Sequence, residues 1–456
     1  MRENDLIELD IIDNGMNFEG IARYKDKVVF VPDTIKGEKV LAKVVKDNPK
    51  YTLAKVQNVL VKSKDRVYED CMSYYSCGGC NGMHMNYSRT LDVKREIVKN
   101  TLRKQGIDDG LVDDIYGMGI PYHYRNKVQF PVRNIKGRNA FGMFSEKSHK
   151  LVEVSNCKIQ DERINEIAKY MFDILNKEGV LCYDETKKSG DVKNIMVRRG
   201  VHTGEVLCIL VVTSREVANS SKIKKVCDSV VQKYEEVKGF VVNINETMGN
   251  VILGKENLVL YGEDRIKDKI GDKAFYISTN SFFQVNTIMA EVIYSVLEQM
   301  LKLDKTENLL ELYSGVGTIG IFLSDKVKSV YGIEIVEDAV NMAKENVELN
   351  NVLNAEYIAG DASKELEKLS KENKVLDVVV VDPPRKGLDN EGINILKRIK
   401  PKKIGYISCN PATLARDLAL LKEEYEISKV VPVDMFPWTS HVECVAVLEF
   451  KKSIDK

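Results

Sequence analysis

The last third of the chain alternates short apolar stretches with helical patterns, and this alternation restricts the possible folds more than any other feature. The pattern of residues 309–313 predicts a strand that leads into a glycine-rich loop and a helix. Strand patterns follow at residues 329–335, 355–358, 375–381 and 404–407, with helical patterns between them. Strands that alternate with helices predict a doubly wound, mostly parallel α/β sheet, whose ligands bind beyond the carboxyl ends of the strands.

The glycine-rich loop favours a nucleotide-like ligand. It contains Gly315, Gly317 and Gly320, and Glu334 lies 17 residues beyond Gly317, at the end of the next strand pattern. Glycines let a ligand approach the backbone closely, and the acid can accept hydrogen bonds from ribose hydroxyls. NAD and S-adenosylmethionine both need these features. The loop alone therefore leaves a nicotinamide-dependent oxidoreductase and a methyltransferase open.

Two further motifs favour S-adenosylmethionine. A run of four valines ends in Asp382-Pro383-Pro384, where two prolines make a rigid shelf that can hold a polar group against a base. Cys409 stands at the end of another strand pattern, just before Pro411, which can begin a helix. A helix N-terminus would favour the thiolate, and a thiol is the most nucleophilic ordinary side chain near neutral pH.

A nucleophilic cysteine fits methylation at C5 of uracil. That carbon cannot attack a sulfonium methyl group unaided, but addition of a thiolate at C6 converts the ring into an enolate that can. Removal of the C5 proton then expels the cysteine, so a general base is required. Glu443 lies in an apolar strand pattern, where burial would raise its pKa. His441 is a weaker candidate.

The N-terminal segment predicts a small barrel. Residues 5–60 contain five short strand patterns, with turn signals at Asn14-Gly15 and Lys36-Gly37. This density of strands is typical of a closed barrel of the OB type, a common nucleic-acid platform, and the segment resembles the TRAM domain of RNA-modifying enzymes. Residues 36–66 hold nine Lys or Arg against three Asp or Glu, a local basic stretch in a chain of zero net charge.

A cysteine-rich segment follows the barrel. Cys71, Cys77 and Cys80 are separated by flexible residues that include two glycines, which suits a metal centre. His84 as a fourth ligand would make a zinc site, whereas the distant Cys157 would complete a set of four thiolates. The spacing leaves both open. Because the chain has no signal-like N-terminus, a disulfide framework is not expected.

The three motifs Asp-Pro-Pro-Arg, Ser-Cys-Asn-Pro and His-Val-Glu-Cys together resemble the RNA uracil-5-methyltransferase family, and specifically its 23S ribosomal RNA branch. The resemblance covers nearly the whole chain and is most specific over residues 281–445. It implies that Cys409 is the nucleophile and Glu443 the base. It also implies that a helix near residues 91–121 packs on the catalytic domain.

The resemblance further implies two sets of binding residues. The S-adenosylmethionine pocket would be lined by Gln284, Tyr313, Thr318, Glu334, Asp361 and Asp382, with Asp382 also facing the uracil. A [4Fe–4S] cluster would be held by Cys71, Cys77, Cys80 and Cys157.

Three domains are expected: a TRAM-like barrel over residues 1–62, a central α+β domain with the cluster over 63–280, and the methyltransferase domain over 281–456. The expected partner is ribosomal RNA, with transfer RNA as the alternative, and Phe282 or Phe283 could stack on a base. An iron–sulfur RNA-binding protein with a vestigial methyltransferase domain is disfavoured, because such a protein has no reason to keep Cys409, Glu443 and Asp382 together.

The chain contains no run of eighteen apolar residues, and five of its first ten residues are charged. These features predict a cytoplasmic protein without a membrane span, and we expect a monomer.

Overall fold

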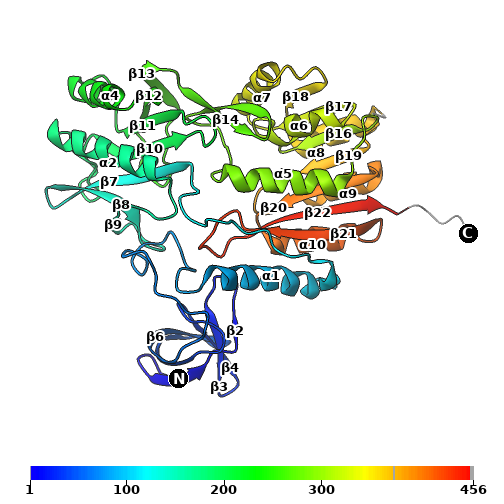
Figure 1. The fold of residues 1–456 in the computed structure, drawn as a ribbon, viewed down its shortest axis with the longest axis horizontal. Coiled ribbons are helices and arrows are strands. Elements are labelled where there is room, and N and C mark those ends of the chain that lie inside the picture. The colour runs from blue at the N-terminus through cyan, green and yellow to red at the C-terminus, as the bar shows by residue number, and fades with distance from the viewer. Residues whose placement is uncertain (1, 373–374, 452–456) are drawn as a thin grey trace, which may run out of the picture.

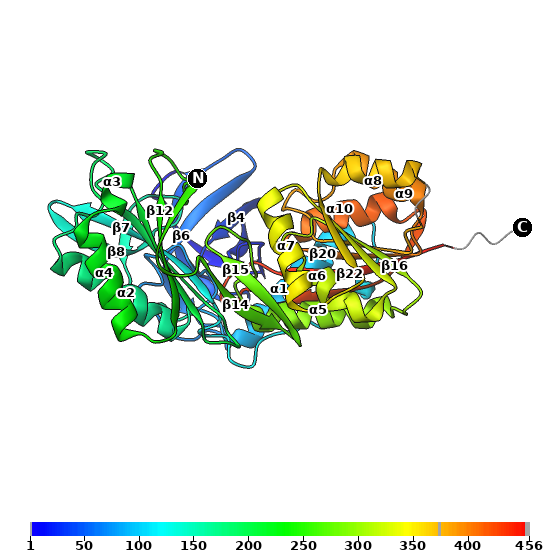
Figure 2. The ribbon, with the colours of Figure 1, turned by 90° about the horizontal axis from the view of Figure 1, so that it is seen from above.

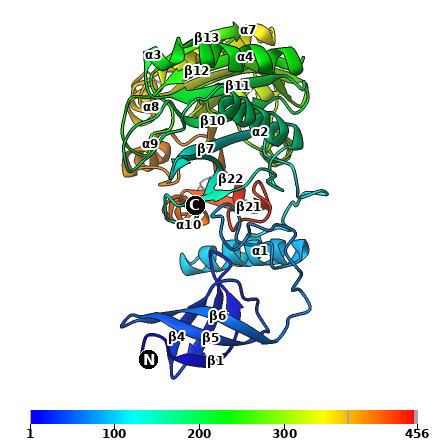
Figure 3. The same ribbon diagram turned by 90° about the vertical axis from the view of Figure 1, so that its left-hand side faces the viewer.

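The computed structural model describes residues 2–372 and 375–451, which form three parts arranged along the chain (Figure 1). A small barrel (blue) lies at the bottom of Figure 1, a central domain (cyan to green) at the upper left, and the C-terminal domain (yellow to red) at the right. Helix α1 (Tyr87–Lys104) lies between the barrel and the C-terminal domain in both Figure 1 and Figure 3.

The barrel is one curled sheet of six strands. Its spatial order is β1-β5-β6-β4-β3-β2, and β1 also approaches β3, so the sheet curls toward closure. Inward positions alternate with outward ones, as Ile7 and Leu9 show in β1. Five strands were predicted, and the sixth is the two-residue strand β2. The bounds are β1 (Leu6–Asp10), β2 (Asp13–Asn14), β3 (Gly20–Tyr24), β4 (Lys27–Val31), β5 (Lys39–Asp47) and β6 (Tyr51–Val61).

The central domain is a seven-stranded sheet in the order β13-β12-β11-β10-β7-β8-β9. Its middle strands are buried on both faces, and α2 and α4 cover one face. The antiparallel hairpin β14–β15 leads from this sheet toward the C-terminal domain (Figure 2). The bounds are β7 (Lys127–Ile135), β8 (Arg138–Phe144), β9 (Leu151–Glu153), α2 (Glu162–Lys177), β10 (Val192–Arg199), β11 (Val206–Val212), α3 (Arg215–Ala218), α4 (Ser221–Lys233), β12 (Val237–Ile244), β13 (Glu256–Gly262), β14 (Arg265–Ile270) and β15 (Lys273–Ser278).

The C-terminal domain is a doubly wound sheet in the order β18-β17-β16-β19-β20-β22-β21. The first five strands run parallel, and β22 is antiparallel to both of its neighbours. The fold class predicted from the sequence is confirmed. The strands are β16 (Asn308–Leu312), β17 (Ser329–Glu334), β18 (Ala355–Ala359), β19 (Val378–Val381), β20 (Lys403–Ser408), β21 (Tyr425–Val433) and β22 (Glu443–Phe450).

Helices cover both faces of this sheet and build two apolar cores. One core includes α5, α6 and α7, and the other includes α8, α9, α10 and part of α1. The helices are α5 (Thr287–Leu301), α6 (Thr318–Leu323), α7 (Glu337–Leu349), α8 (Ala362–Lys371), α9 (Asn390–Ile399) and α10 (Pro411–Leu421), with 3₁₀ turns at Asp109–Leu111 and Ser324–Lys326.

Helix α1 packs against α10 and β21, but it ends at Lys104 instead of continuing toward residue 121. The reason is local. Gly106 adopts a φ of 66°, and Ile107 donates its amide hydrogen to the Leu102 carbonyl, which closes the helix in a Schellman motif.

Candidate active site

The carboxyl ends of the central strands meet at one edge of the sheet. The strand order reverses between the parallel neighbours β16 and β19, because β17 and β18 extend the sheet on one side and β20 on the other. Such a switch point leaves a crevice between the loops that follow the two strands. Leu312 pairs with Val381, so the next residues, Tyr313 and Asp382, both emerge into that crevice.

The register of β20 and β22 brings Cys409 and Glu443 together. Ser408 pairs with Cys444 in this antiparallel ladder, so Cys409 and Glu443 follow as the next opposed positions. Glu443 and Asp382 both act electrostatically on the Cys409 thiol, so all three groups lie close together. Asn410 caps α10 by accepting a hydrogen bond from the Ala412 amide, which fixes the backbone just after the cysteine.

The protonation of Cys409 differs from the expectation. Burial and the neighbouring carboxyls of Glu443 and Asp382 raise the pKa of its thiol above the ordinary value, while Arg385 partly opposes them. The helix N-terminus of α10 was expected to favour the thiolate. Burial, together with the two carboxyls that the fold brings near, acts in the opposite direction and leaves the pKa of the thiol raised.

Three acidic side chains cluster in this crevice. Burial, and after it the neighbouring Asp382, raise the pKa of Glu443 to about 8. Burial raises the pKa of Asp382 to about 7 and that of Glu311 to about 8. No ion pair joins Glu443 or Asp382 to another described residue. A cationic ligand would be attracted to such a site, since a nearby positive charge favours the ionised carboxylates.

The glycine loop is shaped to hold a ligand against β17. The Gly315 amide donates to Oε2 of Glu334 at 3.0 Å, and the Val336 amide donates to Oε1 at 2.9 Å. Each carboxylate oxygen keeps a lone pair for a further donor such as a ribose hydroxyl. Gly317 has a φ of 79°, and a Cβ there would come within 2.8 Å of the Tyr357 ring.

The other predicted pocket residues surround this loop at different depths. Thr318 begins α6, and its hydroxyl is 2.9 Å from that of the buried Tyr294. Tyr313 is partly buried, and Asp361 influences its pKa, which burial raises to about 12. Asp361 caps α8 by accepting the Lys364 amide hydrogen.

Gln284 approaches from the segment before α5. Its backbone carbonyl accepts a hydrogen bond from Asn126, and no other residue of the described chain bonds to its side-chain amide. The amide is thus free to meet a ligand.

Comparisons with known proteins agree with this geometry. Residues 86–451 match the family described as tRNA (uracil-5-)-methyltransferase, and residues 3–62 match the TRAM domain. The chain belongs to the tRNA (uracil-5-)-methyltransferase family. An uncharacterized RNA methyltransferase of Clostridium tetani is 39% identical over 451 residues, covering 99% of this chain and 97% of the relative. Another from Streptococcus mutans is 39% identical over 450 residues, covering 98% and 99%.

One solved structure of this family is similar over its whole length. The Pyrococcus abyssi tRNA (uracil-54, C5)-methyltransferase, solved with S-adenosyl-L-homocysteine, has a TM-score of 0.78 and 28% identity, and the alignment covers 97% of this chain and 99% of that one. This uracil-5-methyltransferase family member is accordingly an S-adenosylmethionine-dependent enzyme that acts on RNA.

The predicted metal ligands line one small cavity. Cys71, Cys77 and Cys80 meet Cys157 there, and all four are free thiols. His84 lies outside this cavity. Its ring is completely buried, and its Nδ1 is 2.8 Å from the Tyr74 hydroxyl. Over residues 2–372 and 375–451, no three His, Cys, Asp or Glu side chains are grouped closely enough to hold a single metal ion. The four thiols therefore share a cavity without converging on one point.

The loop between β21 and β22, residues 434–442, is anchored to α1. Lys94 and Asp434 are both completely buried and form an ion pair. The Tyr87 hydroxyl donates to Asp434 at 2.7 Å, and Nζ of Lys94 donates to the Phe436 carbonyl at 3.1 Å. Since Glu443 immediately follows this loop, α1 helps to set where β22 begins.

The cysteine-rich segment is hydrogen-bonded to the same loop. The amides of Asn81 and Gly82 both donate to the Trp438 carbonyl at 3.0 Å. The Ser440 amide donates to Oδ1 of Asn81 at 2.9 Å. Because Asn81 directly follows Cys80, one loop links the cysteine cavity to the strand that carries Glu443.

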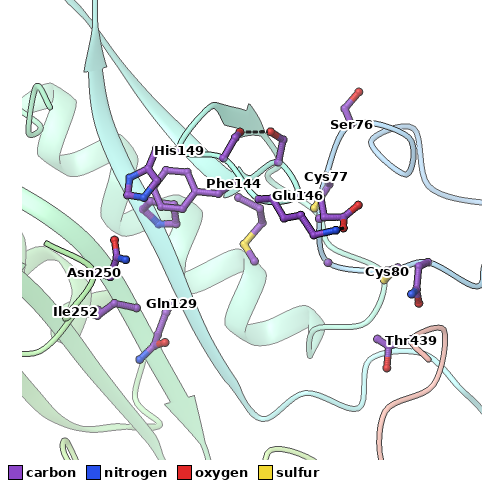
Figure 4. A pocket seen from close by; sticks show the side chains of 18 of the residues that line it. Ser76, Cys77, Cys80, Gln129, Phe144, Glu146, His149, Asn250, Ile252 and Thr439 are labelled. Carbon is purple, nitrogen blue, oxygen red and sulfur yellow. Dashed lines mark hydrogen bonds and ion pairs between the residues drawn. The ribbon is translucent and has the colours of Figure 1, made fainter. Parts of the chain in front are cut away.

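A large cleft of about 1690 Å³ opens between the three parts of the molecule. Gln284, Cys77 and Cys80 line it among the predicted residues (Figure 4 labels the two cysteines). Phe282 also lines it and is 69% exposed, whereas Phe283 is buried in the core of the C-terminal domain. Of the two phenylalanines, then, only Phe282 is available to a ligand.

Several residues of interest were not predicted. The sequence could have revealed two of them. Glu311 is an acid inside an apolar strand pattern, and Arg385 lies within the recognised Asp-Pro-Pro-Arg motif. Tyr294 and the Lys94–Asp434 pair carry no comparable local signal. Their partners lie far away in sequence, so only the fold reveals them.

Proposed function

We propose that this enzyme methylates C5 of a uridine in RNA through a covalent bond between Sγ of Cys409 and C6 of the uracil. The opposed positions of Cys409 and Glu443 at the carboxyl edge of the sheet carry the proposal. A nucleophile and a base on neighbouring strands suit a reaction that adds to one face of a ring and then removes a proton from the adjacent carbon.

S-adenosylmethionine supplies the methyl group as a sulfonium cation. The Cys409 thiolate adds to C6, and the electron pair of the C5–C6 double bond moves into the enolate. After C5 has gained the methyl group, Glu443 removes the C5 proton, the double bond re-forms and the thiolate leaves. Asp382 lies beside both groups and can hold the polar edge of the base. A bound cation would lower the pKa values of Glu443 and Asp382 and so ionise the base.

The cofactor pocket is proposed to use six side chains. Glu334 would accept the ribose hydroxyls, and the acidic cluster around Asp382 would face the sulfonium. The remaining members are Gln284, Tyr313, Thr318 and Asp361.

We further propose that Cys71, Cys77, Cys80 and Cys157 hold a [4Fe–4S] cluster. A cubane offers four separate iron atoms, so its thiolates need not converge on one point. Arg125 lines both the cysteine cavity and the cleft; its Nε is buried without a hydrogen-bond partner, and no carboxylate within the described chain pairs with it. A guanidinium in that position complements the negative charge of a thiolate-ligated cluster.

The RNA is proposed to be 23S ribosomal RNA, recognised by a barrel over residues 1–62 and a central domain over 63–280 that serve a catalytic domain over 281–456. Transfer RNA is the second candidate, favoured by the substrate named for the Pyrococcus abyssi relative. Transfer of a labelled methyl group to unmodified 23S and transfer RNA, followed by mapping, separates the two.

Covalent trapping tests the chemistry. RNA with 5-fluorouridine at the mapped position should hold the enzyme as a stable adduct. Its C5 carries fluorine in place of the proton that the base must remove before the cysteine can leave. Cys409→Ala should form none, whereas Cys444→Ala, which removes a buried thiol on the neighbouring strand, should still form it. An adduct with Cys409→Ala would overturn the nucleophile. On ordinary RNA, Glu443→Gln should attach and methylate but release its product about 10²- to 10⁴-fold more slowly.

A further inference from the structure

The loop between β8 and β9 carries an aromatic stack on the wall of the cleft. The rings of Phe144 and His149 lie 5.3 Å apart, centroid to centroid, with 28° between their planes. Both residues line the cleft, and Figure 4 shows their rings against one another, with Cys77 on one side and Asn250 and Ile252 on the other.

These two rings are not part of an apolar core. Phe141, on the same strand as Phe144, belongs to the core of the central domain. Phe144 and His149 belong to none of the apolar clusters that the described residues form. The His149 side chain is 60% exposed. Burial of apolar area therefore does not account for the stack.

The stack is held rigidly from behind. The Arg133 guanidinium lies 5.1 Å from the Phe144 ring centroid and 6.0 Å from that of Tyr183. The guanidinium of Arg133 already has partners within the protein, since it pairs with Glu185 and donates to the Lys193 carbonyl at 2.7 Å. It thus fixes Phe144 but has little capacity left for a phosphate.

The cysteine-rich segment fixes the other side of the stack. The Gly78 amide donates to the Phe144 carbonyl at 3.2 Å. A Cβ on Gly78 would come within 2.8 Å of the Glu146 amide nitrogen, so the two chains approach as closely as glycine allows. Nδ1 of His149 lies 3.4 Å from the Glu185 carboxylate, which orients its ring. A surface held in this way loses little freedom when it binds.

The surrounding charge favours a polyanion. Seven Lys or Arg side chains line the cleft against four acidic ones; the cations are Lys55, Arg125, Arg133, Lys147, Lys188, Lys193 and Arg385, and the acids are Glu19, Asp33, Glu146 and Glu185. Two of the cations pair with acids of this set, Arg133 with Glu185 and Lys147 with Glu146, which leaves five cations against two acids. A flat aromatic surface inside a positive groove is the combination that binds single-stranded nucleic acid, with bases on the rings and phosphates near the cations.

We propose that Phe144 and His149 form a nucleobase-stacking subsite, which takes an unpaired base that flanks the target uridine. This inference rests on the proposed function only in that the substrate is RNA. The exposed face of His149 receives the base, and Phe144 supports the imidazole from behind. The subsite lies on the central domain, apart from the cysteine and carboxylate that perform the chemistry.

The test uses a single-stranded RNA that spans the mapped uridine, with 2-aminopurine placed in turn at each flanking position. Wild-type enzyme should quench the fluorescence at one flanking position by stacking. His149→Ala and Phe144→Leu should abolish that quenching and weaken RNA binding about tenfold to a hundredfold. His149→Phe, which restores a flat ring, should recover both.

The matched control is His202→Ala. His202 also pairs with a glutamate, at 2.9 Å from Glu291, but it does not line the cleft. S-adenosylmethionine affinity should be unchanged in all four variants. Wild-type quenching and RNA affinity in His149→Ala would overturn the subsite, as would failure of His149→Phe to recover what His149→Ala loses. Wild-type protein that neither forms the 5-fluorouridine adduct nor transfers methyl groups would instead overturn the proposed function.

Discussion

At the scale of single residues, the decisive property is the protonation of Glu443. Its side chain is buried, and burial and Asp382 raise its pKa from 4.5 to about 8. Without a cationic ligand the folded protein therefore keeps this carboxyl protonated at neutral pH. A base that becomes ionised only when a cation arrives would not remove protons prematurely.

The raised pKa predicts how stability depends on pH. Between about pH 4.5 and pH 8 the folded protein keeps a proton on Glu443 that the unfolded chain has lost, so the free energy of unfolding falls as pH rises. Each pKa unit is worth about 1.4 kcal/mol, which gives a loss of at most several kcal/mol. Glu443→Gln removes this contribution, so its melting temperature should decline less than that of wild type between pH 5 and pH 9.

The control for this prediction is Glu449→Gln, on the same strand but exposed to solvent. It should follow the wild-type curve. Parallel curves for Glu443→Gln and wild type would mean that Glu443 has an ordinary pKa in the folded protein.

At the scale of elements, the loop of residues 434–442 joins helix α1, the cysteine-rich segment and strand β22. Its anchors include the buried pair Lys94–Asp434 and the reciprocal contacts of Asn81 with Ser440. No hydrogen bond or ion pair from another described residue holds the Glu443 side chain, so its direction depends on the backbone that this loop positions.

Breaking the Lys94–Asp434 pair should therefore affect both stability and turnover. Lys94→Met leaves a buried carboxylate without its cation and should cost about 3–5 kcal/mol of unfolding free energy. The double variant Lys94→Met/Asp434→Leu should recover much of that stability, yet release product more slowly than wild type because the loop is no longer anchored. Denaturant unfolding and single-turnover kinetics measure the two effects.

Lys104→Met, an exposed lysine at the end of the same helix, serves as the control and should change neither quantity. If the stable double variant releases product at the wild-type rate, the loop does not position the base.

The cysteine cavity gives a second prediction at this scale. Protein purified without oxygen should be brown and contain about four iron atoms per chain. Cys80→Ser should lower the iron content and the visible absorbance, whereas Cys227→Ser, a buried thiol in the central domain, should not. Colourless protein with bound zinc would contradict the assignment.

At the scale of the whole molecule, three parts enclose one cleft. The barrel is not an independent appendage: Phe18 and Ile35 share a small apolar cluster with Val93 and Ile97 of α1. Deleting residues 1–62 would therefore expose apolar surface as well as remove RNA contacts. Substitution of single cleft residues is the cleaner way to test the part that the barrel has in RNA binding.

Lys55 on strand β6 faces the cleft and is exposed. Lys55→Ala should weaken RNA binding and reduce the slope of log affinity against log salt by about one, because one phosphate contact is lost. Lys50→Ala, also exposed but outside the cleft, should leave the slope unchanged. Equal slopes for wild type and Lys55→Ala would remove this face of the barrel from RNA recognition.

The sequence by itself determined the features that depend on short-range pattern and residue chemistry. Alternation of apolar and helical stretches specified the doubly wound sheet, since each strand of a parallel sheet must be buried on both faces. The glycine loop and Glu334 indicated the ligand class, because close backbone approach and a ribose acceptor are local requirements. Cys409 was recognisable because it lies between a strand and a helix-starting proline.

Only the tertiary structure decided which distant groups meet and in what protonation state. Lys94 and Asp434 are 340 residues apart, and no sequence pattern around either residue indicates that they pair. The pKa of Cys409 is raised because folding buries the thiol and brings Glu443 and Asp382 beside it, which helix position alone could not predict. Likewise, Phe144 and His149 belong to no sequence motif. They form an exposed aromatic stack only because the β8–β9 loop borders the cleft. Burial and electrostatics act through space, so their sign depends on neighbours that strand register and domain packing supply.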